Sequence, residues 1–183
     1  FGLNEDKDDI VRENVAENPK TGSLTLEEMA EHDAVIDVKL AALGNPNIPT
    51  RVIHRMAAGT GKRVRETIAG NISTPKTILM KSARDRDTNV AYNVACNPNV
   101  PREALTILAE RRNIGILVAV VRNKNTPEEA LAKLARNNNR NLRLLIAEHE
   151  NTSRETLEFL LLKAVKEADQ KLAETVRLAL AKQ

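Results

Sequence analysis

The sequence predicts an all-α protein: an α-solenoid of about six helical repeats, followed by a C-terminal helical cap. Three observations predict it. Asparagine recurs every 26 residues, at positions 45, 71, 97 and 123. All seven prolines occupy only two positions of this period, and apolar residues recur within it at helical spacing. A repeat of this length is one supersecondary unit that cannot bury its apolar face alone, so its copies must stack around a continuous core.

Each repeat is expected to begin with a short helical segment. Three apolar residues at i, i+4 and i+5, such as Val64, Ile68 and Ala69, make one side of it. The same triplet appears as Val11, Val15 and Ala16, as Val90, Val94 and Ala95, as Ile116, Val120 and Val121, and as Leu142, Ile146 and Ala147.

An asparagine ends each first segment, usually with proline beside it. Proline cannot continue a helix and biases the preceding residue away from the helical region, so the chain must turn there. An asparagine amide can close such a turn. We interpret the column as an internal hydrogen-bonding ladder, and the alternative is a recognition groove lined by asparagine. This asparagine ladder consists of Asn18, Asn45, Asn71, Asn97 and Asn123, with His149 at the next step.

A second helix follows each turn, because proline at a helix start is tolerated there and recurs at one register position. Those prolines are Pro49, Pro75, Pro101 and Pro127. The first core column of this helix holds Leu26, Ile53, Leu79, Leu105, Leu131 and Leu157. The second column, three residues on, holds Met29, Met56, Ser82, Leu108, Leu134 and Leu160. Ser82 is the one polar residue in these columns.

The ends of the chain depart from the repeat. Residues 1–10 form an acidic lead-in, and residues 11–152 form the solenoid. Residues 153–183 contain no Gly or Pro and keep a helical stripe from Leu157 to Leu180. We expect them to form one or two capping helices that belong to the same domain, since terminal repeats need a different outer face.

The motifs Val11-Arg12, Val15-Ala16 and Asn18-Pro19 recur as Val64-Arg65, Ile68-Ala69 and Asn71. With this recurring motif, the sequence resembles the leucine-rich repeat variant family over roughly residues 11–161. The resemblance implies a right-handed superhelix in which α-helices alternate with short 3₁₀-helices, and it brings no catalytic residue. One architecture in that family carries a cysteine-rich iron–sulfur module, but the single Cys96 lies inside a repeat, so no cluster ligand carries over.

The sequence shows no constellation that predicts catalysis or metal binding. Its three histidines, His32, His54 and His149, occupy different register positions, so stacking does not bring them together. We expect each to be an ordinary surface or turn residue, and we expect no cofactor. A single cysteine excludes an intrachain disulfide. No apolar run is long enough to cross a bilayer, so we predict no membrane contact and a cytoplasmic protein.

Charge is distributed unevenly along the chain. Residues 1–36 carry ten acidic against three basic side chains, a balance of −7, and residues 37–143 carry eight against nineteen, a balance of +11. Basic residues gather in the connectors between repeats, where stacking would align them along one edge. This predicted basic ridge consists of Lys62, Arg63, Arg84, Arg86, Arg111, Arg112, Arg136 and Arg140.

These features predict a non-enzymatic scaffold that binds another macromolecule, most simply a protein with an acidic surface. The alternative is a solenoid that binds nucleic acid through the basic ridge, and an enzyme is the third possibility. The scarcity of aromatic residues counts against single-stranded nucleic acid, which binds by base stacking. A homo-oligomer is also open, either through residues 157–180 or by head-to-tail contact between the acidic residues 1–36 and the basic ridge.

Overall fold

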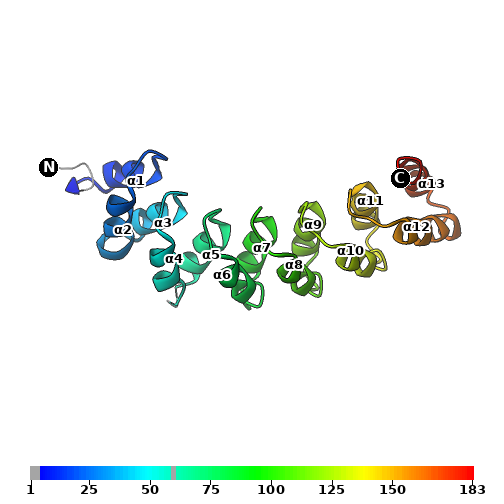
Figure 1. Cartoon of the computed structure of the whole chain (residues 1–183), viewed down its shortest axis with the longest axis horizontal. Helices are drawn as coiled ribbons and strands as arrows, with labels where there is room; N and C mark the ends of the chain where they lie inside the picture. The colour runs from blue at the N-terminus through cyan, green and yellow to red at the C-terminus, as the bar shows by residue number, and fades with distance from the viewer. Residues whose placement is uncertain (1–4, 59–60) are drawn as a thin grey trace. The chain divides into compact units, whose positions relative to one another are not determined.

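The structure is a computed structural model that describes residues 5–58 and 61–183. These residues form thirteen α-helices, and they contain no β-strand (Figure 1). The predicted all-α class is therefore confirmed. The chain divides into two compact units, residues 1–99 and 100–183, and each is described by itself.

The first unit stacks helix pairs in two layers. Its helices are α1 Asp9–Glu17, α2 Ser23–His32, α3 Ile36–Gly44, α4 Thr50–Ala57, α5 Lys62–Gly70, α6 Lys76–Ser82 and α7 Thr88–Cys96. The odd-numbered helices α1, α3, α5 and α7 pack one against the next, and α2 packs against α4 in the other layer. This is the packing of a helical solenoid, in which each repeat contacts its sequence neighbours.

The second unit repeats the arrangement and ends in the cap. Its helices are α8 Arg102–Leu108, α9 Ile114–Arg122, α10 Glu128–Leu134, α11 Arg140–Glu148, α12 Arg154–Lys166 and α13 Gln170–Leu180. Here α9, α11 and α13 form one row, and α8 packs against α10. The cap is two helices, α12 and α13, separated by Ala168 in the left-handed region with a φ of 54°. The Asp169 N–H donates to the Ala164 carbonyl at 2.8 Å, which closes the end of α12.

Turn chemistry sets where the helices begin. Pro49, Pro75, Pro101 and Pro127 are the N-cap residues of α4, α6, α8 and α10, one position before the first helical residue. Of the helices that open the repeats, α1, α7, α9 and α11 begin with a side-chain cap, such as Asp87 on α7 and Asn139 on α11, whereas α3 and α5 have none. Both helices of each described repeat are α-helices. The 3₁₀ character that the family resemblance implies appears as i→i+3 hydrogen bonds at helix ends, such as Arg84 N–H to the Lys81 carbonyl at 3.1 Å, and in the turns that follow the ladder, such as Thr74 N–H to the Asn71 carbonyl at 3.1 Å.

The predicted first core column is buried throughout. Leu26, Ile53, Leu79, Leu105 and Leu131 are fully buried, and Leu157 is 1% exposed. In the second column Met29, Leu108, Leu134 and Leu160 are buried, whereas Met56 and Ser82 are half-buried. The aliphatic core expected from the periodicity is therefore present in both units, and it is least complete near Met56 and Ser82.

The asparagine ladder ties each repeat to the one before it. The Nδ2 atom of Asn71 donates to the Leu43 carbonyl at 2.6 Å and to the Asn45 carbonyl at 3.0 Å, and its Oδ1 accepts from the Ser73 N–H at 2.7 Å. Asn45 and Asn97 bond in the same way to the carbonyls one repeat earlier. All three are buried. Their amides therefore find buried acceptors in the preceding repeat, where the carbonyls of Asn45 and Asn71 also accept a backbone N–H from three residues later.

His149 takes the place of an asparagine at the last step of the ladder, 26 residues after Asn123. Its Nδ1 lies 3.0 Å from the Asn151 N–H, and its Nε2 lies 3.1 Å from the Asn123 carbonyl. Because Nδ1 must accept the backbone N–H, Nε2 carries the ring proton and donates to the carbonyl. The surface or turn role expected for this histidine is thus, in the structure, a half-buried turn position with the hydrogen-bonding pattern of the ladder.

Candidate functional site

The basic residues of the first unit fall into two groups. Lys62 and Arg63 begin α5, and both pair with acids: Lys62 Nζ lies 3.1 Å from Asp87, and Arg63 lies 2.5 Å from Asp37. Arg84 and Arg86 lie in the connector between α6 and α7. Both are exposed, and neither forms an ion pair with any residue in the described ranges. Of the four predicted ridge residues in this unit, the two whose charge is left for an external anion therefore lie in the α6–α7 connector.

A fixed ion pair holds that connector in place. Arg65 Nε, from α5, lies 2.7 Å from Asp85 Oδ2, and the Asp87 N–H donates to Asp85 Oδ1 at 2.9 Å. Burial raises the pKa of Asp85, but the hydrogen bonds from Arg65 and from the Asp87 N–H outweigh it and leave that pKa below its ordinary value. Asp85 is therefore ionised at neutral pH, and its charge is balanced by Arg65 rather than by Arg84 or Arg86.

The ridge residues of the second unit are similarly mixed. Arg140 begins α11 and pairs with Asp169 at 2.6 Å. Arg111 is half-buried. Arg112 and Arg136 are exposed, without an acidic partner among residues 5–58 and 61–183. Lys62, Arg63 and Arg140, from the predicted ridge, thus pair with acids of other repeats, which the linear charge count does not reveal.

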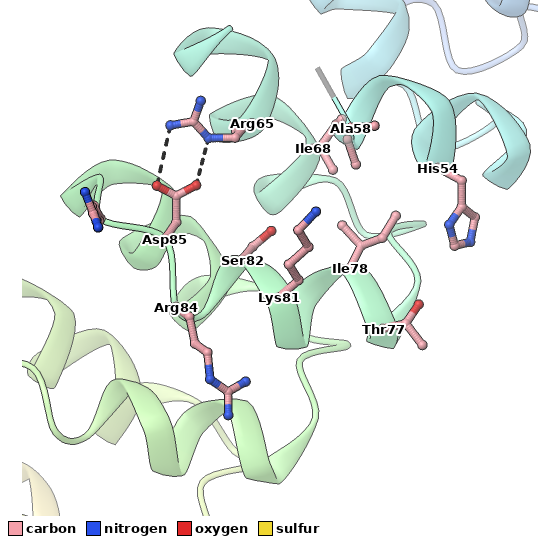
Figure 2. A pocket seen from close by; sticks show the side chains of 12 residues that line it. His54, Ala58, Arg65, Ile68, Thr77, Ile78, Lys81, Ser82, Arg84 and Asp85 are labelled. Atoms are coloured by element: carbon pink, nitrogen blue, oxygen red, sulfur yellow. Dashed lines mark hydrogen bonds and ion pairs between the residues drawn. The ribbon is translucent and has the colours of Figure 1, made fainter. Parts of the chain in front are cut away.

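A pocket of about 640 Å³ opens beside the α6–α7 connector in the first unit. One side is apolar and is lined by Ala57, Ala58, Ile68 and Ile78. The other side is basic and is lined by Arg65, Lys81, Arg84 and Arg86, with Ser82 and Asp85 between. Figure 2 shows the Lys81 ammonium pointing toward the side where Ala58 and Ile68 lie, with Arg84 directed the opposite way. We call this hollow the Ser82 pocket.

The Ser82 pocket occurs where a core column is interrupted. Ser82 follows Lys81 at the end of α6 and replaces the Met or Leu that the other repeats place at this position. Its hydroxyl forms no hydrogen bond with any described residue. The sequence marks Ser82 as an exception, but sequence alone did not predict that space would remain beside it.

Acidic residues gather around a second hollow in the same unit. It measures about 500 Å³ and is lined by Glu13, Glu17, Asp37 and Glu66, with Arg63 as a base among them. The acidic residues 1–36 therefore contribute Glu13 and Glu17 to this hollow, and Asp37 on α3 and Glu66 on α5 add to them, within the unit that also holds the Ser82 pocket.

The predicted apolar stripe at the C-terminus is partly used in packing. Leu157, Leu172 and Val176 are buried, whereas Leu162 and Leu178 remain 72% and 60% exposed. Self-association through residues 157–180 stays a prediction that rests on the exposed members.

Other chemistry is sparse in the described part of the chain. Among residues 5–58 and 61–183, His, Cys, Asp and Glu form no group that could hold a metal ion. His32 is exposed, His54 lines the Ser82 pocket, and Cys96 is an exposed free thiol. Within the same ranges, none of the helices combines the length and apolar character that crossing a bilayer requires.

A solved structure supports the family resemblance. It is described as a leucine-rich repeat variant with a novel repetitive structural motif, and the match covers 98% of this chain and 67% of that one, at 26% sequence identity and a TM-score of 0.65. A designed armadillo repeat protein also matches, at 13% sequence identity and a TM-score of 0.35. That match covers 98% of this chain and 96% of the designed one. No family model and no curated protein matches the chain significantly. The resemblance to a leucine-rich repeat variant is confirmed, and the chain is a helical repeat scaffold by fold.

Proposed function

We propose that this chain is a non-enzymatic scaffold that binds a protein partner carrying an acidic surface, through the α6–α7 connector of its first unit. The observation that carries the proposal is the connector itself. Arg84 and Arg86 are exposed and have no acidic partner among the described residues, while Arg65 neutralises the neighbouring Asp85. The remaining positive charge is therefore available to a partner.

Protein is favoured over nucleic acid because the site offers little to a base. The residues that line the Ser82 pocket include no Phe, Tyr or Trp, so the large aromatic platforms of single-strand binders are missing from it, and His54 is its one ring. Its apolar side is suited to side chains of a protein. Exposed ion pairs contribute little individually, so the basic connector supplies attraction and orientation, and apolar contact supplies most of the affinity.

The test is affinity capture from the native cell with two charge-matched double variants. Arg84→Glu/Arg86→Glu reverses the connector, and Lys20→Glu/Lys76→Glu makes the same change in net charge at exposed lysines elsewhere in the first unit. We expect the first variant to lose its protein partner and the second to retain it, with and without nuclease. Retention of the same partner by both variants would refute the proposal. Partners that disappear on nuclease treatment would favour nucleic acid instead.

Self-association is distinguished by molecular mass. If the partner were a second copy, the acidic hollow around Glu13 and Glu17 would contact the α6–α7 connector in a head-to-tail arrangement. The mass of the purified chain would then fall on adding salt, and the Arg84→Glu/Arg86→Glu variant would be a monomer at every salt concentration. A mass that is constant across the salt series supports an external partner.

A further inference from the structure

The Ser82 pocket lacks a side chain that the neighbouring repeats supply themselves. The second core column carries Met29 in the first repeat and Leu108, Leu134 and Leu160 in later ones, all of them buried. At the same register position a serine ends α6, and a pocket of about 640 Å³ lies beside it. The apolar side chains that a Leu or Met would contact at this position therefore line an open hollow.

The floor and the rim of this pocket differ in chemistry. Ala57 and Ala58, together with the largely buried side chains of Ile68 and Ile78, give an apolar floor, and burial of an apolar group against it is favourable. Lys81 projects into the pocket from α6 and has no ion pair with a described residue, while Arg84 is directed away from the apolar side (Figure 2). Arg86 also lines the pocket. A ligand that fits both parts has an apolar end and negative charge beside it.

We infer that the Ser82 pocket receives one apolar side chain from an acidic segment of the partner protein, with flanking Asp or Glu side chains paired to Lys81, Arg84 and Arg86. This inference rests on the proposed function and adds what the partner must contain. The inserted side chain takes the place of the missing core residue at position 82. The flanking carboxylates meet cations that no described acid neutralises, whereas Asp85 does not repel them because Arg65 balances its charge.

An inorganic or nucleic-acid phosphate fits the pocket less well. A phosphate seated on the floor would meet the Lys81 ammonium, but it would also lose water against Ala57, Ile68 and Ile78, which offer no hydrogen-bond donor from their side chains. A phosphate at the rim would leave the apolar floor empty. The combination of floor and rim therefore favours an apolar residue with acidic neighbours in one peptide segment.

The experiment selects short random peptides displayed on phage against the intact chain, followed by fluorescence anisotropy with the enriched peptides. We expect enrichment of a Leu, Ile, Met or Phe next to Asp or Glu. Ser82→Leu places the side chain that three other repeats carry in the part of the pocket beside position 82, and it should weaken the enriched peptides about ten- to one-hundred-fold, the equivalent of burying one such side chain. Ser82→Met is a second filling variant, and Ser82→Ala is the control that leaves the pocket open and affinity unchanged.

The outcomes separate this inference from the proposed function. Weaker peptide binding by Arg84→Glu/Arg86→Glu together with undiminished binding by both filling variants overturns the inference and leaves the function standing. Equal binding by every variant overturns both. Failure to enrich apolar residues beside acids also overturns the inference. Thermal melting of each variant is the fold control, and Ser82→Leu is expected to melt no lower than the wild type because the column accepts leucine elsewhere.

Discussion

Replacing Asn71 with alanine tests what the asparagine ladder contributes to stability. The substitution removes two donor bonds, to the carbonyls of Leu43 and Asn45, and one acceptor bond from the Ser73 N–H. Asn71 is only 4% exposed, so water does not readily replace these partners. At about 1 kcal/mol for each hydrogen bond, we expect the free energy of unfolding to fall by about 3 kcal/mol.

Asn18 supplies a matched control within the same column. It accepts the Lys20 N–H at 2.9 Å in the same kind of turn, but it is exposed, and its Nδ2 has no partner in the described ranges. Asn18→Ala should therefore cost less than about 1 kcal/mol, because water can replace the lost bond. The difference between the two variants isolates the bonds between repeats.

Asn71→Asp separates hydrogen bonding from packing. The aspartate keeps an oxygen for the Ser73 N–H but presents a second oxygen, instead of two N–H donors, to the two carbonyls. At neutral pH we expect it to destabilise at least as much as alanine does, although its volume is almost unchanged. The assay is denaturant unfolding followed by far-ultraviolet circular dichroism, compared at equal m values. The reasoning is refuted if Asn71→Ala is no more destabilising than Asn18→Ala.

Three further predictions follow from the core, the ladder and the ion pairs. Leu105→Ala leaves a cavity at a fully buried position and should lower the free energy of unfolding by about 2–5 kcal/mol, whereas Leu24→Ala, at a side chain 75% exposed, should lower it by less than about 0.5 kcal/mol. The two variants are compared by denaturant unfolding. Equal losses would mean that the core column is misassigned. His149→Phe should cost about 2 kcal/mol because it removes both ring hydrogen bonds, whereas His149→Asn should cost less than half as much, and identical melting curves would contradict this. The hydrogen bond from Arg12 holds the pKa of Asp33 below its ordinary value of 3.8. The stability that this carboxylate contributes is therefore present above pH 3.8 and is lost as the pH falls through the lower pKa of the folded state. Arg12→Gln removes the hydrogen bond, so the free energy of unfolding should depend less on pH in acid for this variant than for the wild type.

Periodicity was enough to predict the helical fold because a solenoid repeats its contacts as it repeats its sequence. Leu105 and Leu131 share a register position, and both are fully buried. A second hydrogen-bonding column was missed although its signal has the same period. Ser73 donates to the Pro46 carbonyl and Asn99 to the Ile72 carbonyl, each at 2.6 Å, from a position two residues after the ladder. Recurrence of a polar residue at this step could have predicted these bonds.

The candidate site was harder to predict because it depends on contacts that do not repeat. The connectors hold basic and acidic residues together, and the sequence does not say that Lys62 pairs with Asp87 while Arg84 forms no ion pair with a described residue. Likewise, Ser82 is conspicuous in its column, but whether the vacated space closes or stays open depends on how Ala57 and Ile68 pack around it. Such differences between repeats are where a repetitive sequence carries function, because the shared positions are already committed to packing.

The ladder also has a direction. Asn45, Asn71 and Asn97 each donate to carbonyls of the repeat before them, so the acceptors precede the donor in the chain by 26 to 29 residues. A ribosome releases the N-terminal repeat first, and each later asparagine then emerges to find its acceptors already formed. A nascent chain can therefore add repeats one at a time, because the carbonyls that accept from each asparagine amide have already been synthesised when that amide becomes buried. Loss of a repeat from the C-terminal end would leave carbonyls that water can solvate at the new end, whereas loss from the N-terminal end would strand an amide that had lost both acceptors.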